Sequence, residues 1–254
     1  MKSFVSDTSI VKNIWGKSDT VLFIFAGAAG EFALNKSVDW LYFTGKLPAD
    51  PIGRLFSTVA YARQIIFSEE QQAHAAIDRM RGIHSAVEAA RGARIPDWAF
   101  RDVLYMLVHY SITAFELLER ELSWPEKEEV CHVFCRVGQR MGIPGLPQDY
   151  RQWLAQRRLQ LSENLQYTPY TLDLYKQYRK HLGSFRYTIL VRAQGHLLPA
   201  EALRLLQQRR SKVFGRLMGI YRFFKDSRAK DWIRHAFLPG KYRAQIRALD
   251  VIPK

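Results

Sequence analysis

Apolar residues recur at helical spacing along most of the chain, and the alternating pattern of a half-buried strand is nearly absent. Residues 69–90 have one apolar face, which predicts a long helix. The apolar positions of this segment are Ala73, Ile77, Met80, Ile83 and Val87. Residues 98–122 are apolar at almost every position, which indicates the buried central helix of an all-α domain. We therefore expect an all-α fold, a single domain over residues 1–254 with about eight to ten helices.

Local start and stop signals place the ends of several helices. Asp50 is a favourable N-cap residue, and Pro51, which follows it, suits the first position of a helix. Ser123 and Glu126 have the spacing of a capping box, and they predict a helix that runs to about Met141 and ends at Gly142.

Further helices are expected in the C-terminal part of the chain. The predicted segments are 150–167 after Asp149, 171–182 before Gly183, 185–195, and 199–224. The segment 185–195 is apolar and fits either a strand or a helix, but its position between helices favours a helix. Gly27-Ala28-Ala29-Gly30 is interpreted as small-residue packing, because no Lys-Ser or Lys-Thr pair of a phosphate loop follows it.

The positive charge is concentrated in the C-terminal part. The net charge is +14; residues 151–254 hold 22 Lys and Arg against 6 Asp and Glu, whereas residues 1–150 hold 16 and 18. Residues 198–254 form a basic helical region, and residues 198–224 mix cations with apolar residues in the pattern of an interfacial helix. A solvated face, contact with an anionic membrane and nucleic-acid binding all stay open, with nucleic acid the least favoured.

Composition excludes several classes of protein. Hydrophobic residues make up 48% of the chain, which excludes intrinsic disorder, and two cysteines exclude a disulfide framework. The longest apolar run, residues 21–29, is shorter than the roughly 20 residues of a membrane span, and the N-terminus has no signal-peptide pattern, so we expect a cytoplasmic protein. Cys131 and Cys135 lack a second cysteine pair for structural zinc, so we expect them to be inert buried thiols.

Four residues are candidates for a chemical role. Arg54 and Thr58 lie at i and i+4 on one helix face, and by themselves they indicate an ion-pairing arginine and a back-bonded threonine. His84 and His109 lie on two consecutive predicted helices that could pack together. Each fits a hydrogen-bonded core histidine, but a neutral imidazole in a dry apolar pocket is also an axial ligand of haem iron.

The order and spacing of several short motifs resemble a known family. The motifs are Ala26-Gly27-Ala28-Ala29, Asp50-Pro51-Ile52-Gly53-Arg54-Leu55-Phe56-Ser57-Thr58, Tyr61, Arg81 and His84 with Val87 and Gly92, the aromatic-rich helix from Asp97-Trp98 to His109, Leu122-Ser123 with Glu126-Lys127-Glu128, Gly142-Ile143-Pro144, and Pro147 to Tyr150. Over roughly residues 20–220 the chain resembles the mpaB-type oxygenases, which include the latex clearing proteins that cleave rubber.

The resemblance implies a fold, a cofactor and a site. It implies an all-helical domain with a globin-like core and a b-type haem. Arg54 and Thr58 match the helical Arg-x-x-x-Thr motif and would line the haem pocket as catalytic and cofactor-binding residues. His84 matches the proximal iron ligand, and His109 matches a second histidine that lines the pocket or orients the ligand or the propionates. The haem would be held non-covalently, because no Cys-x-x-Cys-His motif is present.

The chain also departs from the family pattern. Ser57 stands where the rubber-cleaving members have a lysine, and no acid lies at the spacing of their catalytic acid, for which Glu31 and Asp39 are loose candidates. Rubber cleavage itself is therefore not implied. Two hypotheses follow. One is a haem b-dependent oxidoreductase, an oxygenase, acting on an unsaturated hydrophobic or lipid-like small molecule. The other is a non-catalytic helical protein that binds an anionic surface through its basic C-terminal region, peripherally to a membrane.

Overall fold

The computed structural model describes residues 2–45, 49–224 and 249, and this part of the chain is all-α, as predicted. Eleven helices lie within the described residues, and they include no β-strand. The helices are α1 (Ile10–Trp15), α2 (Ser18–Phe32), α3 (Val38–Phe43), α5 (Pro51–Phe67), α6 (Glu70–Arg91), α7 (Asp97–Leu118), α8 (Trp124–Met141), α9 (Tyr150–Glu163), α10 (Pro169–Leu197), α11 (Ala200–Leu205) and α12 (Lys212–Phe224).

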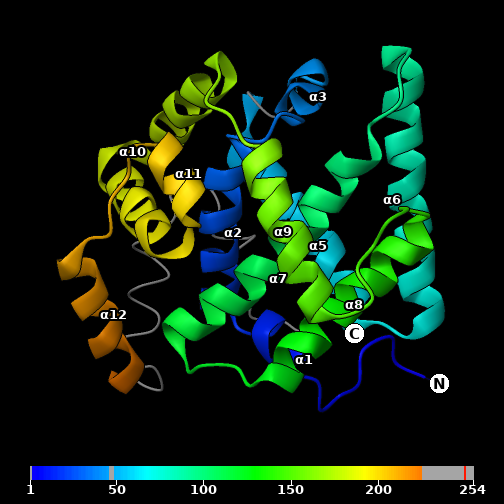
Figure 1. Cartoon of the computed structure of the whole chain (residues 1–254), viewed down its shortest axis with the longest axis horizontal. Helices are drawn as coiled ribbons and strands as arrows, with labels where there is room; N and C mark the ends of the chain where they lie inside the picture. Colours follow the sequence, from blue (N-terminus) through cyan, green and yellow to red (C-terminus); the bar gives the residue numbers. More distant parts are fainter. Residues whose placement is uncertain (1, 46–48, 225–248, 250–254) are drawn as a thin grey trace.

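Helix α2 lies in the middle of the molecule, with α7 and α10 packed against it (Figure 1). Its small residues permit this close packing. A Cβ atom on Gly27 would overlap the ring of Tyr110 on α7, and one on Gly30 would lie 2.9 Å from Nε2 of Gln194 on α10. The small-residue segment of α2 is therefore a helix-packing surface, which confirms that interpretation.

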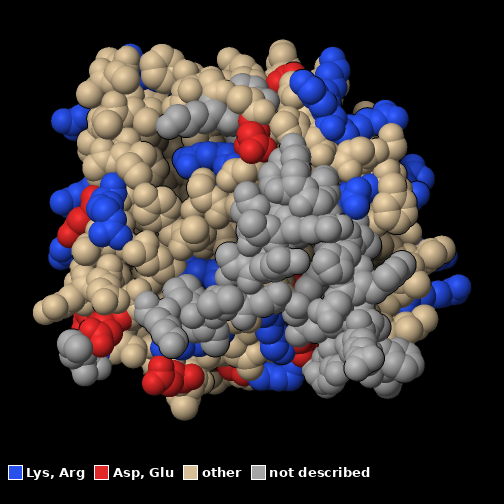
Figure 2. Space-filling view, turned by 180° about the vertical axis from the view of Figure 1, so that it is seen from behind, with Lys and Arg blue, Asp and Glu red and all other residues tan. Residues whose placement is uncertain are grey.

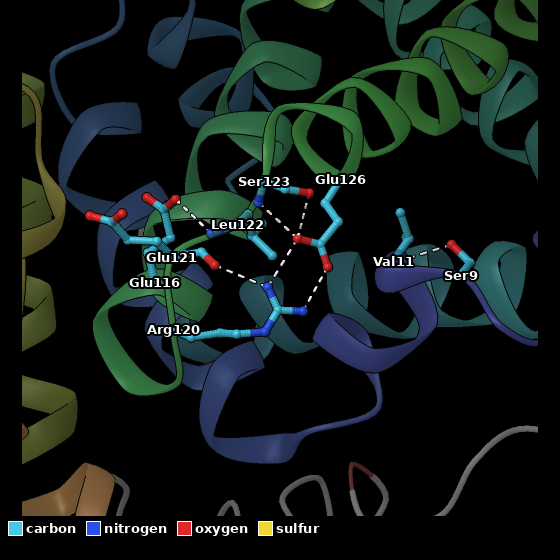
Figure 3. Close-up of polar contacts among 8 residues, drawn as sticks. All are labelled: Ser9, Val11, Glu116, Arg120, Glu121, Leu122, Ser123 and Glu126. Atoms are coloured by element: carbon cyan, nitrogen blue, oxygen red, sulfur yellow. Dashed lines mark hydrogen bonds and ion pairs between the residues drawn. The ribbon is translucent and has the colours of Figure 1, made fainter.

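The predicted helix ends are confirmed where the signal is local. The Asp50 side chain accepts a hydrogen bond from the Gly53 amide, and Pro51 begins α5. At the start of α8, Ser123 and Glu126 form the predicted capping box, and Arg120 pairs with Glu126 across the connection from α7 (Figure 3). Gly142 ends α8 in the left-handed conformation, at φ 77°, which glycine adopts without steric cost.

Helix α10 joins two segments that the sequence separates. Residues 185–195 are helical, as favoured, and follow residues 171–182 within one element. Gly183, at φ 76° and ψ 162°, is not helical, so it separates two helical segments within α10 at the position where the sequence predicts an end.

The single amphipathic helix predicted for residues 199–224 is wrong, because the structure has α11 and α12 with a turn between them. Gln207 adopts φ 54°, and Gln208 Nε2 donates hydrogen bonds to Tyr175 Oη (3.2 Å) and Gln194 Oε1 (3.3 Å). These contacts with α10 hold the turn in place and outweigh the helical periodicity. Residues 225–248 and 250–254 of the basic region lie outside the described residues.

Within residues 2–45 and 49–224, no helix is both long enough and apolar enough to cross a membrane. Among the described residues, the Lys and Arg side chains that Figure 2 shows lie in several separate groups.

Candidate active site

A cavity of about 280 Å³ lies among α2, α5, α6, α7 and α8. Its walls are almost entirely apolar, and they include Phe25, Phe32, Leu55, Ile66, Met80, Phe100, Met106, Phe134 and Val137. Three of the four predicted site residues, Arg54, Thr58 and His84, line it together. Helix α5 supplies the first two and α6 supplies the histidine, so the packing of α5 on α6 brings the predicted residues to one cavity.

Arg54 and Thr58 lie one turn apart on α5. The hydroxyls of Thr58 and Ser57 both donate to the Arg54 carbonyl, at 3.3 and 2.7 Å, as expected for back-bonded side chains within a helix. The Arg54 guanidinium itself donates to Ser57 Oγ at 3.3 Å. In the described part of the chain no carboxylate pairs with Arg54, so it brings a positive charge to the cavity wall.

His84 carries a buried nitrogen without a partner. Its Nδ1 makes no hydrogen bond to any described residue, and the imidazole meets the Phe100 ring edge-on at 5.2 Å between centroids. Burial, together with the nearby Arg54 guanidinium, lowers the pKa of His84 below its ordinary value. The imidazole is therefore neutral near pH 7 and has a lone pair to offer a ligand.

His109 does not line this cavity, so the structure does not bring it to Arg54, Thr58 and His84. It is buried on α7 beside the Glu31 and Arg157 ion pair, with the Leu197 carbonyl as its hydrogen-bond partner. Burial and the Arg157 charge lower the pKa of His109 to about 4. The residues of α7 that line the cavity centre on Val103 and Leu107, and His109 lies toward another side of the helix, beside Glu31 and Arg157.

Neither loose candidate for the catalytic acid lies on the cavity. Glu31 is fully buried in a bidentate ion pair with Arg157, at 2.5 Å, and accepts a hydrogen bond from Tyr110 at 2.6 Å. Burial raises the pKa of Glu31, but Arg157 outweighs burial and keeps the pKa below its ordinary value. Asp39 pairs with Arg91 at 2.7 Å. No Asp or Glu appears among the described residues that line the cavity.

Two features of the cavity are absent from the sequence prediction. Ile83 on α6 and Val103 on α7 both line the cavity and are 45% and 37% exposed, so the cavity reaches the surface through an apolar rim between these helices. Trp40 on α3 also lines the cavity, and the Arg91 guanidinium at the end of α6 stacks on its ring at 4.0 Å. In the sequence Ile83 is one of the apolar positions of residues 69–90, and that pattern does not separate an exposed apolar residue from a buried one.

The thiols of Cys131 and Cys135 lie 4.0 Å apart inside α8, and both are buried as expected. They do not line the cavity.

Over the described residues, the fold and this site define an all-helical protein built around a large apolar cavity, whose described lining includes one arginine and one neutral histidine. Residues 16–244 match the family described as ER-bound oxygenase mpaB/B'/Rubber oxygenase, catalytic domain. The chain therefore belongs to this oxygenase family, as its motifs indicate. Comparison with curated proteins gives no match, and neither does comparison with solved structures.

Proposed function

We propose that this oxygenase-family protein binds haem b in the cavity and acts on an unsaturated hydrophobic molecule. The observation that carries the proposal is the neutral imidazole of His84 on the wall of an apolar cavity of about 280 Å³, with a buried Nδ1 that has no partner among the described residues. A neutral imidazole on the wall of a dry apolar pocket suits the role of an axial ligand of haem iron.

The other residues of the cavity also suit a haem. Apolar and aromatic side chains would contact the faces of the porphyrin, and Arg54 offers a guanidinium to a propionate carboxylate. When bound, the haem iron would supply the chemistry that activates dioxygen.

The chain's own residues would position the reactants and exclude water. His84 would hold the iron from α6, and Thr58 would present a hydroxyl from α5. The apolar rim of Ile83 and Val103 would admit a hydrophobic substrate. Because no described carboxylate lines the cavity, the reaction would proceed without a carboxylate base from these residues, and the walls would serve to orient the substrate next to the cofactor.

A pyridine haemochrome assay tests this proposal. Full-length protein, produced with haem supplementation and purified, should carry about one equivalent of haem b and show a Soret band. Less than about a tenth of an equivalent in folded protein would overturn the proposal. Addition of a hydrophobic alkene should then cause uptake of dioxygen by the haem-loaded protein and not by the haem-free protein.

A second candidate function, peripheral contact with an anionic membrane, is favoured by the surface of α12. Phe214, Met218 and Tyr221 face the core, whereas Val213, Leu217 and Ile220 are 67%, 52% and 55% exposed. Lys212 and Arg216 are exposed beside the outward apolar side chains, and this combination suits a helix that lies in a lipid interface.

The charge of this segment gives a measurable prediction. Changing Arg209, Arg210 and Lys212 together to Gln should reduce sedimentation with phosphatidylserine vesicles at about 0.15 M salt, because each basic side chain near such a surface contributes roughly 1 kcal/mol. A matched control changes Lys176, Arg179 and Lys180 on α10 to Gln. These side chains are also exposed, and their substitution removes the same amount of charge. If both variants sediment as the parent does, the basic face only interacts with water and the membrane proposal is wrong.

A further inference from the structure

A second, smaller cavity of about 60 Å³ lies among α2, α5 and α10, beside the large one. Phe25, Ala29, Leu55 and Tyr178 line both cavities, so these side chains form the shared wall. The remaining lining is Leu22, Ala26, Ile52, Phe56, Val59, Leu182, Arg186 and Leu190. Among the described lining residues, Arg186 on α10 is therefore the single charged one, and the others are apolar or aromatic.

The small cavity has a buried inner end and a half-buried outer end. Its residues on α2 are almost all buried, whereas Phe56, Arg186 and Leu190 are half-buried. The cation thus lies at the end of the cavity nearer to solvent, and the apolar surface lies deeper. This arrangement matches a molecule with a charged head and an apolar chain, because the head keeps contact with water while the chain leaves it.

Arg186 has no described partner that would explain its position. Its Nε is buried and makes no hydrogen bond to any described residue, and none of the ion pairs within residues 2–45 and 49–224 includes Arg186. No Asp or Glu appears in the described lining of either cavity. A buried guanidinium nitrogen without an acceptor is costly, and a carboxylate with two oxygens is the acceptor that fits its geometry best.

We propose that the small cavity is the head-group site for a long-chain carboxylate, with Arg186 binding the carboxylate and the chain running along α2 toward the large cavity. The apolar wall shared by the two cavities would direct the hydrocarbon end of the ligand toward the side of the protein that carries His84. That this ligand is also the substrate rests on the proposed haem-dependent function, whereas the carboxylate site itself does not.

The binding of two probes that differ only in the head group tests the site. Oleate and oleyl alcohol have the same chain, and each is titrated into the full-length protein below the concentration at which it self-associates, with and without haem. The parent should bind oleate more tightly than the alcohol. Arg186→Gln should weaken oleate binding about tenfold and leave the alcohol unchanged, and Arg186→Lys should recover most of the loss.

Two further variants separate this site from general effects. Arg192→Gln removes an exposed charge from the same helix and lines neither cavity, so it should bind oleate as the parent does. Leu190→Trp fills the cavity and should weaken both probes. Equal oleate affinity in the parent and in Arg186→Gln would overturn the proposal. So would equal affinity of the parent for oleate and the alcohol. Binding of oleate through Arg186 in a protein that takes up no haem would overturn the proposed function and leave this site intact.

Discussion

Changing His84 to Ala is expected to abolish haem retention. Among the described residues of the cavity, His84 is the one with a buried imidazole nitrogen that lacks a partner, and its lowered pKa keeps that nitrogen unprotonated near neutral pH. Loss of an axial ligand removes the strongest single contact that the chain could offer to iron. The haem content after purification, measured as the pyridine haemochrome, should fall by at least tenfold.

His109→Ala is the matched control for this prediction. His109 on α7 is also a buried histidine, but it lies beside Glu31 and Arg157 and does not line the cavity. Its variant should keep most of the haem, and a far-ultraviolet circular dichroism spectrum of each variant shows that it is folded. If His109→Ala loses the haem and His84→Ala retains it, the two histidines have been assigned the wrong way round. If both retain it, both are core histidines.

Protonation should act in the same direction as the His84 variant. Because the pKa of His84 is lowered, its imidazole is still neutral at a pH where an ordinary histidine is already protonated. It becomes protonated only as the pH falls further. Only the neutral form can bind iron. Haem retention should therefore persist to mildly acidic pH.

Changing Glu31 to Gln is expected to destabilise the fold by about 3–5 kcal/mol. The change leaves Arg157, which is 3% exposed, as a buried charge that has lost its bidentate carboxylate partner. A double change, Glu31→Leu with Arg157→Met, removes both charges and should cost less than the single change, because no unpaired charge remains. Urea unfolding of the parent and of both variants measures the differences.

A surface pair provides the control for Glu31. Asp78 and Arg140 form an ion pair at 2.6 Å, but their side chains are 36% and 44% exposed, so Asp78→Asn should change the free energy of unfolding very little. If Glu31→Gln and Asp78→Asn lower the free energy of unfolding by similar amounts, burial of the Glu31 ion pair is not what makes its loss costly. The pKa of Glu31 is lowered in the folded state, so its contribution is present above the ordinary pKa of Glu and is lost as the pH falls through the lowered value.

Local signals predicted helix ends well, because a cap involves residues that are close in sequence. Helix α5 begins after the cap at Asp50, and α8 begins at the capping box of Ser123 and Glu126 and ends at Gly142, as these residue types predict. The ion pair of Glu31 with Arg157 could not be predicted in this way, because it joins α2 to α9 and no local pattern marks either residue as the partner of the other.

The orientation of α12 shows why periodicity alone was insufficient. The helix has two apolar rows, one of Phe214, Met218 and Tyr221 and one of Val213, Leu217 and Ile220. Either row satisfies the helical pattern, so the sequence does not determine which one packs on the body. The contacts of Phe214 with Phe23 and His196 make that choice in the structure.

The convergence of Arg54, Thr58 and His84 on one cavity followed from family motifs rather than from composition. Arg54 and Thr58 share a helix face by spacing, but only the packing of α5 on α6 places His84 beside them. Arg186 was not predicted at all, since a single arginine on a basic helix has no sequence feature that marks it as lining an apolar cavity.

Helix α6 is supported mainly at its two ends. Its buried residues, Ala73, Ala76 and Ile77, all lie in the half that precedes His84. At the far end Arg91 fastens the helix to α3 by pairing with Asp39 and stacking on Trp40, which itself lines the cavity. The segment that carries His84 thus lies between two points of contact, one at each end of α6. Loss of the contacts between Arg91 and α3 would let this segment move outward, so the entrance beside Ile83 would widen and His84, the proposed haem ligand, would move with it.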